Sequence, residues 1–389
     1  MFLIRQAKPT DQDALLKWAK MVHFTNLPAD PREIAKRIEW SQACFQAVSR
    51  GEPVGAVRRG RVGGAGGDSP RFMFVAEDMH TRKPIGTSAI IAKMGSPGSP
   101  NYSFQLRRHD FWSEDLKTGA QHMTVKLVAD EDGPTEIGGL IVAPDARAAG
   151  VGRVISFVRF HFMALHRELF EDRVLAEMMA PISDDGQSFF WESFGRRFIN
   201  RSYKEADLFS QRSREFIAAL FPREEVYLSL LPADAVQVVA QVGEETKPAR
   251  AMLERVGFRH LDRVDPFDGG PHLECDTDQI LPVKATRRAD LLGAAPAGRA
   301  RREALVSVER PGGSDEPFLA ALAPIAESAD GSGVRLPAEA MKALRAEPGM
   351  TIGVMPMDEA WPTVAGAKRA KSATPPRKRA RAGAAPRTN

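Results

Sequence analysis

Cysteine is scarce in this 389-residue sequence, which contains Cys44 and Cys275 and no others. Two cysteines cannot form a disulfide framework or a cysteine-based zinc site, so we expect a protein of the reducing cytoplasm. No apolar run approaches about 18 residues, and residues 1–8 lack the pattern of a secretory signal. The eight histidines show no metal-ligand spacing. We therefore predict no membrane contact, no metal and no permanently bound cofactor.

Acidic residues are missing from the end of the chain. Residues 368–389 contain eight basic side chains and no acidic one, which leaves a charge of −4 for residues 1–367 of a chain with net charge +4. Large apolar residues are also rare there, so we predict a disordered basic tail over residues 361–389. Two interpretations stay open for this tail: contact with nucleic acid, or a solubilising extension.

The length and composition predict two or three domains with a proper core, since 43% of the residues are hydrophobic. We expect a main body over residues 1–281, interrupted by a flexible glycine-rich insertion at 51–70. A small β-rich C-terminal unit should follow over 282–360. The stretch 294–333 is rich in Gly, Ala, Pro and Ser, and we predict that it acts as a linker to this unit.

Strand and helix patterns alternate along the main body, which predicts an α/β or α+β architecture. A helix should follow Thr10 as its N-cap, and a second should start at Pro31. A long helix is expected at 150–165, and in the C-terminal unit a helix at 336–344 and a strand at 351–355. Strands of the main body are expected at 2–7, 72–76, 85–92, 124–129, 136–142 and 173–178.

The stretch 136–153 carries the clearest chemical signal. A predicted strand ends at Val142, and an Arg147-Ala-Ala-Gly150-Val-Gly152 sequence leads into the long helix. Glycines at a helix start let backbone N–H groups approach an anion, and the helix dipole adds partial positive charge, as a pyrophosphate requires. The P-loop pattern and the Gly-x-Gly-x-x-Gly fingerprint are both absent here, so neither class of nucleotide-binding protein is supported.

Arg-x-x-Gly-x-Gly after a strand resembles the acyl-CoA signature of the GNAT N-acyltransferase superfamily; the alternative is a chance glycine-rich helix cap. Gly138 and Gly139 within the strand predict a bulge or the close approach of a ligand. The resemblance implies an α+β fold with a mixed sheet flanked by helices. It also implies a CoA site formed by Leu140, Val142, Arg147, Ala148, Gly150, Val151, Gly152 and Arg153.

Further segments resemble the arginine N-succinyltransferase family, at 27–30, 74–78, 140–147, 176–178, 189–192, 216–218 and 267–274. The resemblance implies that residues 1–281 form an acyltransferase domain. It implies transfer of a succinyl group from succinyl-CoA, as co-substrate, to the α-amino group of arginine in arginine catabolism. It also implies a homo-oligomer, a β-rich C-terminal unit, and a succinyl-CoA contact at Leu140.

The sequence departs from this family at the proton donor. Gly243 occupies the position of the family histidine, and Leu253 the position of the superfamily's tyrosine. We expect Glu136 to act as a water-mediated general base and Glu244 as a substitute acid, with Tyr227 as a further candidate. For both carboxylates the alternative is a solvent-exposed structural residue. General acid–base assistance contributes ~10²–10⁴-fold, so a slow but active enzyme is one outcome of losing the histidine. The alternatives are a different proton donor, or an altered or inactive enzyme.

Arginine as acceptor requires carboxylates for its guanidinium. Glu177, Asp268 and Glu274 lie in the matching segments and are the candidates, with Asp184 near them; for each one a structural role is the alternative. Two rival functions remain open. One is an acyltransferase with a changed donor or acceptor, such as acetyl-CoA, ornithine or a peptide amine. The other is a non-catalytic CoA-binding or nucleic-acid-associated protein.

Overall fold

The computed structural model describes residues 2–21, 27–54, 69–296, 298–312, 314–331 and 333–362. For Ala148 and Ala149 the description is limited to the backbone. Most of the expected insertion at 51–70 and nearly all of the expected tail at 361–389 lie outside these residues. The α+β prediction is confirmed, because helices flank one mixed sheet whose strands run both parallel and antiparallel.

The strands follow the order β12-β15-β11-β14-β13-β1-β2-β3-β6-β7-β10-β9-β4-β5-β8. The strands of the main body are β1 Phe2–Gln6, β2 Arg71–Asp78, β3 Pro84–Ile91, β4 Asn101–Ser113, β5 Thr118–Asp130, β6 Thr135–Val142, β7 Arg173–Glu177, β8 Val226–Tyr227, β9 Arg259–Val264 and β10 Pro271–Asp276. Its helices are α1 Gln12–Met21, α2 Pro31–Arg50, α3 Val151–Leu165, α4 Arg196–Ile199, α5 Tyr203–Ser210, α6 Glu215–Leu220, α7 Ala233–Val238, α8 Lys247–Val256 and α9 Leu281–Ala285.

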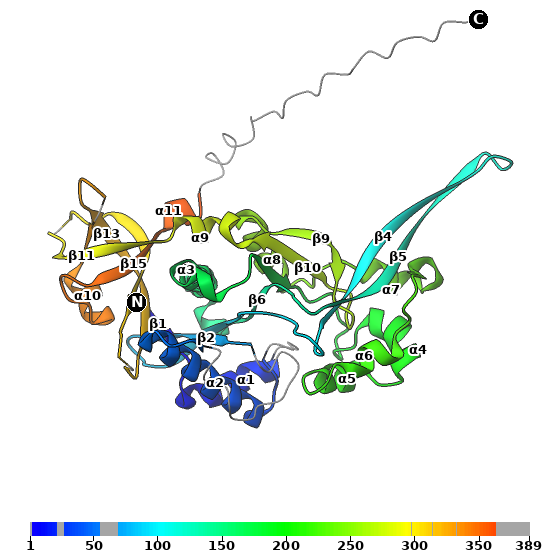
Figure 1. Ribbon diagram of the computed structural model, residues 1–389, viewed down its shortest axis with the longest axis horizontal. Helices are drawn as coiled ribbons and strands as arrows, with labels where there is room; N and C mark the ends of the chain where they lie inside the picture. Colours follow the sequence, from blue (N-terminus) through cyan, green and yellow to red (C-terminus); the bar gives the residue numbers. More distant parts are fainter. Residues whose placement is uncertain are drawn as a thin grey trace, which may run out of the picture.

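Strand β2 shows how the sequence sorts its side chains between the two faces. Side chains alternate across a strand, so every second residue faces the same layer. Met73 and Val75 join an apolar cluster with α1 and α2, whereas Phe72 and Phe74 join a cluster that contains much of α3. Helices therefore cover both faces of this part of the sheet (Figure 1).

The start of α2 is as predicted, but the start of α1 is not. Asp30 caps α2, since its side chain accepts hydrogen bonds from the N–H groups of Arg32 and Glu33, and Pro31 is the first helical residue. Thr10 was expected to cap the first helix. It lies instead inside a 3-10 turn, Pro9–Asp11, and the carboxylate of Asp11 accepts a hydrogen bond from the N–H of Lys8.

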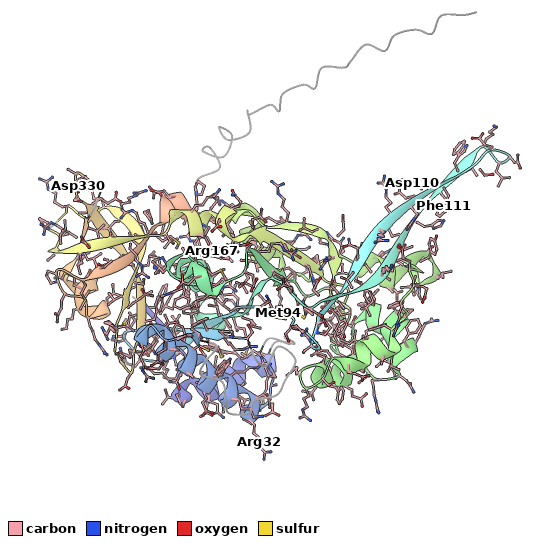
Figure 2. All side chains as sticks on the ribbon, viewed as in Figure 1. Arg32, Met94, Asp110, Phe111, Arg167 and Asp330 are labelled. Atoms are coloured by element: carbon pink, nitrogen blue, oxygen red, sulfur yellow. The ribbon has the colours of Figure 1, made fainter. Side chains whose placement is uncertain are left out.

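Strands β4 and β5 form a long hairpin that projects from the body (Figure 1). Asp110 and Phe111 lie on its outer half (Figure 2), where Phe111, Trp112 and Leu116 are exposed. The sequence predicted a strand at 124–129 and missed the rest of the hairpin. Both faces of its outer half meet solvent, so the alternation of apolar and polar residues that identifies a half-buried strand is absent there.

The C-terminal region closes on itself. Strand β11 pairs with β14, β14 with β13, β13 with β12, β12 with β15, and β15 with β11, which makes a five-stranded ring around an apolar core. The elements are β11 Arg287–Ala294, β12 Arg302–Glu309, β13 Phe318–Glu327, β14 Gly333–Leu336, α10 Ala338–Leu344, β15 Thr351–Pro356 and α11 Met357–Ala360. Strand β13 also pairs with β1, which joins this region to the main sheet.

The β-rich character expected of this region is confirmed, but the linker expected at 294–333 is wrong. That stretch contains β12 and β13, which pair along eight residues. Small residues contribute to the core of the ring, where Ala304, Ala321 and Ala323 are buried. In the part of the chain that the structure describes, no helix is both long enough and apolar enough to cross a membrane.

Candidate active site

The site forms where strand β6 parts from its parallel neighbour β7. The two strands share the pairs Thr135–Val174 and Glu136–Leu175, after which their pairing ends. On its other edge β6 pairs with β3 through Gly138–Ala89 and Ile141–Thr87, so two residues of β6 oppose one of β3. Gly139 has φ +59, the left-handed conformation that glycine adopts most readily. The bulge predicted from Gly138 and Gly139 is therefore confirmed.

A cavity opens between the separated strands. Its walls come from segments that are far apart in the sequence: residues 137–140 of β6, residues 176–179 at the end of β7, and Leu253 and its neighbours on α8. The rest of the lining consists of Arg159, Tyr203, Asp207, Glu245, Thr246, Asp265, Phe267 and Asp268. Leu140 lies in this wall, at the bulge, as the resemblance implied.

The glycine-led turn after β6 has the predicted form. Strand β6 ends at Val142, a 3-10 helix spans Pro144–Ala149, and α3 begins at Val151. Gly150 has φ +71 and is exposed, so its backbone is open to a ligand. The first N–H groups of any α-helix lack partners within the helix and favour an anion.

The other residues expected at the CoA site lie around this turn. Arg147 is exposed within the 3-10 helix, which also contains the backbone of Ala148. Val151 is buried, and Arg153 is partly buried with its guanidinium 6.0 Å from the ring of Trp361. Gly152 faces Val142: a Cβ added at Gly152 would lie 3.6 Å from a methyl group of that valine. The structure thus places the predicted residues together around the end of β6 and the start of α3.

The wall opposite the bulge is acidic, with the carboxylates of Glu177, Asp207, Glu245, Asp265 and Asp268. Two of these five hold the backbone in place. Asp268 accepts hydrogen bonds from the N–H of Ala180 (3.0 Å) and of Gly270 (2.7 Å), so it fixes the end of β7 to the turn before β10. Asp265 accepts hydrogen bonds from the N–H of Phe267 (2.7 Å) and of Asp268 (3.1 Å).

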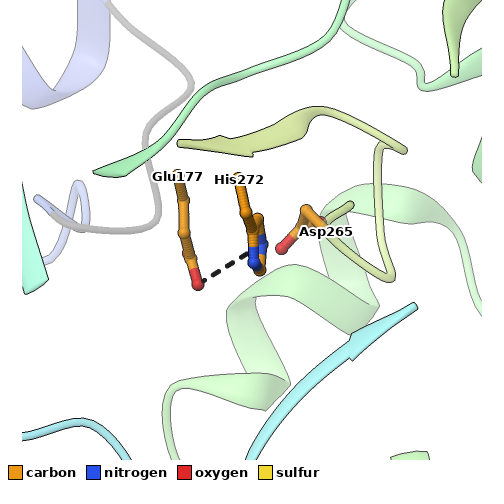
Figure 3. Close-up of side chains that lie close together, drawn as sticks. All are labelled: Glu177, Asp265 and His272. Atoms are coloured by element: carbon orange, nitrogen blue, oxygen red, sulfur yellow. Dashed lines mark ion pairs between the residues drawn. The ribbon is translucent and has the colours of Figure 1, made fainter. Parts of the chain in front are cut away.

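Glu177, Asp265 and His272 form a cluster at the base of this wall (Figure 3). Each offers one ligand atom, and these atoms all lie within 4.8 Å of one another. Glu177 and His272 meet because β7 and β10 pair at these two residues, and Glu177 Oε1 lies 3.7 Å from His272 Nε2. Among the described residues, that nitrogen has no hydrogen-bond partner.

Burial controls the protonation of this cluster. It raises the pKa of Glu177 well above its ordinary value, and the charges of Glu136 and Asp265 raise it further. Burial lowers the pKa of His272 to about 3, assisted by the positive charges of Arg263 and His260. The imidazole is therefore neutral at physiological pH, and Glu177 is a carboxyl whose proton is held more firmly than usual.

Three carboxylates expected to act in the site are not among the residues that line the cavity. Glu136 is buried, and its charge raises the pKa of the cavity carboxyl Glu177, so its role as a water-mediated base stays a prediction. The side chain of Glu244 is 85% exposed and pairs with Lys247 on the solvent side. Glu274 is outside the cavity lining and pairs with Arg173 at 2.9 Å.

Two further candidates are also displaced. Tyr227 is exposed on β8, where its ring packs near those of His109, Phe111 and His122 on the projecting hairpin. Asp184 is exposed in the loop after β7. Of the expected catalytic and substrate-binding residues, the structure brings Glu177 and Asp268 into the cavity.

Sequence reasoning missed Arg159, Tyr203, Asp265 and His272. Arg159 did carry a signal, since it is a charge inside an otherwise apolar helix that is buried along most of its length. Tyr203 is the first residue of α5, behind the Ser202 cap, and nothing in its local sequence marks it. His272 and Asp265 become neighbours of Glu177 only when β10 pairs with β7, about a hundred residues apart in sequence.

A bulged strand that parts from its parallel neighbour beside a glycine-led helix start defines the class: a GNAT-like N-acyltransferase. The sequence profile of a family described as "Arginine N-succinyltransferase beta subunit" matches residues 2–282. Proteins named arginine N-succinyltransferase from Escherichia fergusonii and Shigella dysenteriae are each 34% identical over 300 residues, which cover 76% of this chain and 82% of theirs.

A solved structure agrees with these matches. Subunit AI of an arginine/ornithine succinyltransferase from Pseudomonas aeruginosa superposes with a TM-score of 0.72 at 26% identity. The match covers 92% of this chain and 98% of that one. The chain belongs to the arginine N-succinyltransferase family.

Gly150→Glu should weaken CoA binding by ~10-fold or more, because a carboxylate at the helix start would repel the pyrophosphate. Calorimetric titration with CoA measures the change. Gly349→Glu is the matched control: Gly349 has φ +88, and an added Cβ meets nothing within 4 Å, as at Gly150. The control has similar backbone strain but should bind CoA normally. Equal affinity of the Gly150→Glu variant and the wild type would contradict the assignment of this turn.

Glu177→Gln should make the protein more stable than the wild type at alkaline pH, and the advantage should vanish on acidification. A carboxyl whose pKa is raised by folding loses stability as the pH climbs from its unfolded value, about 4.3, towards its folded pKa. Glutamine has no proton to lose, so the variant escapes this loss. Urea unfolding between pH 4 and pH 9 tests the prediction, with Glu244→Gln as the solvent-exposed control. A constant difference across this range would refute it.

Proposed function

We propose that this chain transfers the succinyl group of succinyl-CoA to the α-amino group of arginine, the activity for which its family is named. One observation carries the proposal: the cavity beside the bulge of β6 has an acidic wall, suited to a cationic amino acid, within reach of the glycine-led helix start. A thioester and an amine can therefore meet at the bulge.

The CoA moiety enters at the turn between β6 and α3. Its pyrophosphate lies at the start of α3, over Gly150 and Gly152, with Arg147 and Arg153 as nearby positive charges. The pantetheine follows β6 past Val142 to Leu140, where the strand is no longer paired with β7. A backbone N–H of the bulge then polarises the thioester carbonyl, as preorganised donors do in acyl transfer.

The arginine substrate occupies the acidic side. Its guanidinium pairs with carboxylates of the wall, of which Asp207 and Glu245 are on the rim and Asp265 is deeper. Glu177 and His272 receive the α-amino group, and Glu177 accepts the proton that the ammonium must lose before it can attack. The ammonium group of the bound arginine lowers the pKa of the Glu177 carboxyl and so prepares it as a base.

The chemistry then balances without a metal or redox partner. The neutral amine attacks the thioester carbon, a C–N bond forms, and the carbonyl oxygen becomes negative at the bulge. The nitrogen is positively charged after the attack. As the tetrahedral intermediate collapses, the C–S bond breaks, the nitrogen loses its second proton, and the departing CoA thiolate takes up a proton in exchange. The products are N-succinylarginine and free CoA, and Glu177 releases the proton it took from the amine.

Tyr203 is the proton donor that we assign to the leaving thiolate. It lies buried in the cavity wall, and burial together with the nearby Asp268, Asp207 and Asp265 raises its pKa well above the ordinary value. The hydroxyl is therefore always protonated at neutral pH. It takes over from the family histidine, whose position is Gly243, and from the superfamily tyrosine, whose position is the cavity residue Leu253.

Other expectations stay predictions. The geometry of the site does not bear on three of them: the homo-oligomer, the contact of the basic tail with nucleic acid, and the cytoplasmic location. Ornithine and acetyl-CoA remain the first alternative substrates to compare. A protein that only binds CoA is not favoured, because the acidic wall of the cavity, which suits a cationic amine, would then have no ligand.

The wild type should release thiol from succinyl-CoA when L-arginine is present, and Tyr203→Phe should lower kcat by ~10²-fold, the low end of general acid catalysis. Adding Gly243→His to Tyr203→Phe should restore part of the rate. The backbone accepts a side chain here, since a Cβ at Gly243 lies 3.5 Å from the carbonyl oxygen of Ala180, an ordinary contact. A thiol reagent follows each reaction.

Tyr227→Phe, on the projecting hairpin, is the matched control and should be as fast as the wild type. Ornithine in place of arginine, and acetyl-CoA in place of succinyl-CoA, complete the assay. No thiol release by the wild type with succinyl-CoA and arginine would overturn the proposed function. A Tyr203→Phe variant at full rate would remove only the assignment of the acid.

A further inference from the structure

Arg159 is a buried cation at the base of the cavity. It lies on α3, is 2% exposed, and lines the cavity next to the bulged strand. Its Nε donates a hydrogen bond to the carbonyl of Ser156 (3.0 Å), one terminal nitrogen donates to the hydroxyl of Ser156 (2.6 Å), and the other approaches the carbonyl of Gly138 at 3.4 Å. All three contacts are to neutral groups.

The lack of a carboxylate partner is unusual for a buried arginine. Arg5, which is 4% exposed, shows the ordinary solution: it pairs with Asp11 and with Glu77, each at 2.7 Å. Among the residues that the structure describes, Arg159 has no ion pair, and burial alone lowers its pKa to about 9. An isolated buried charge is costly unless something compensates it.

The position of Arg159 indicates what compensates it. Among the described residues that line the cavity, it is the only one with a positive charge, and five carboxylates line the same space. These carboxylates do not pair with it; they belong to the wall that receives the cationic substrate. Both substrates bring a carboxylate, the α-carboxylate of arginine and the distal carboxylate of the succinyl group. Arg159 lies against Gly138 of the bulged strand, on the side where the acyl group is held, which favours the succinyl carboxylate.

We propose that Arg159 binds the distal carboxylate of the succinyl group and so selects a dicarboxylic acyl donor over a neutral one. The inference rests on the proposed succinyl transfer and adds the residue that distinguishes a succinyl group from a neutral acyl group. Gly138, whose carbonyl Arg159 approaches, is two residues from Leu140, where the thioester carbonyl is held. That separation is at most about 7 Å along the strand.

The succinyl group has the length that this arrangement requires. Three C–C bonds of about 1.5 Å separate its thioester carbon from its carboxylate carbon. With one end held by a backbone N–H at the bulge, the other end comes within hydrogen-bonding distance of the guanidinium. A bidentate guanidinium–carboxylate pair in a buried site is both strong and directional. Acetyl and butyryl groups present no charge there and leave Arg159 unpaired.

Arg159→Met tests the inference in a comparison of succinyl-CoA with butyryl-CoA, which has a methyl group in place of the carboxylate. With arginine as acceptor, kcat/KM for succinyl-CoA should fall by ~10²–10³-fold, as expected for loss of one partner of a buried ion pair. The value for butyryl-CoA should not fall. Arg159→Lys should retain part of the preference for succinyl-CoA, because it keeps the charge and loses the bidentate geometry.

The ratio of the two donors separates a selective role from a structural one. If Arg159 only ties α3 to β6, Arg159→Met will lose both activities equally, and this result would overturn the inference. Calorimetric affinity for CoA shows whether the variant is folded. If it is not, Ser156→Ala provides the test: it removes one neutral partner of the guanidinium and should lower the succinyl preference in the same direction. An unchanged ratio in Ser156→Ala would then count against the inference.

The proposed function and this inference fail in different ways. A wild type that is inactive with succinyl-CoA and arginine contradicts the function itself. A wild type that is active, with a donor preference that survives Arg159→Met, contradicts only the role of Arg159.

Discussion

The separation of β6 from β7 is the constraint on which the site depends. The strands pair at their first residues, and Glu136–Leu175 is the last pair they share. Beyond it, backbone groups that a continuous sheet would satisfy become available to a ligand, and such groups require partners when they are buried. The bulge at Gly139 adds one residue to β6 on its other edge. A sheet that was regular here would have neither the cavity nor the exposed backbone.

The cavity separates charge in a way that works against folding. Carboxylates gather on one wall, where their burial and mutual repulsion raise the pKa of Glu177 and of Asp268, while Arg159 lies on the other side with neutral neighbours. Among the described residues, Arg159 has no ion pair of the kind that Arg5 makes with Asp11 and Glu77. A cationic acceptor and an anionic acyl group neutralise both sides together, so substrate binding should stabilise the folded state. Low intrinsic stability at a site is a common cost of function.

The sequence predicted those parts of the site that depend on local backbone. Gly138 and Gly139 indicated the bulge, and Arg147 with Gly150 and Gly152 indicated the turn into α3, because glycine conformation and helix starts are properties of short segments. It failed for residues that meet across the sheet. Glu274 and His272 are two residues apart on β10 and so share a face, and only the register of the pairing with β7 places His272 opposite Glu177 and Glu274 opposite Leu175. A pattern of period two does not reveal that register.

The absence of the family histidine alters less than the sequence suggested. At position 243 the backbone supports the cavity rim, because the N–H of Gly243 donates a hydrogen bond to the carbonyl of Met179. Any residue other than proline can make that contact, so the side chain can be lost without a change in the scaffold. A CoA thiol ionises at about 8.5, which makes the thiolate a good leaving group and limits what an acid must contribute. On the proposed mechanism, the bulge and the acidic wall determine the class of reaction, whereas the side chain at position 243 affects only the rate.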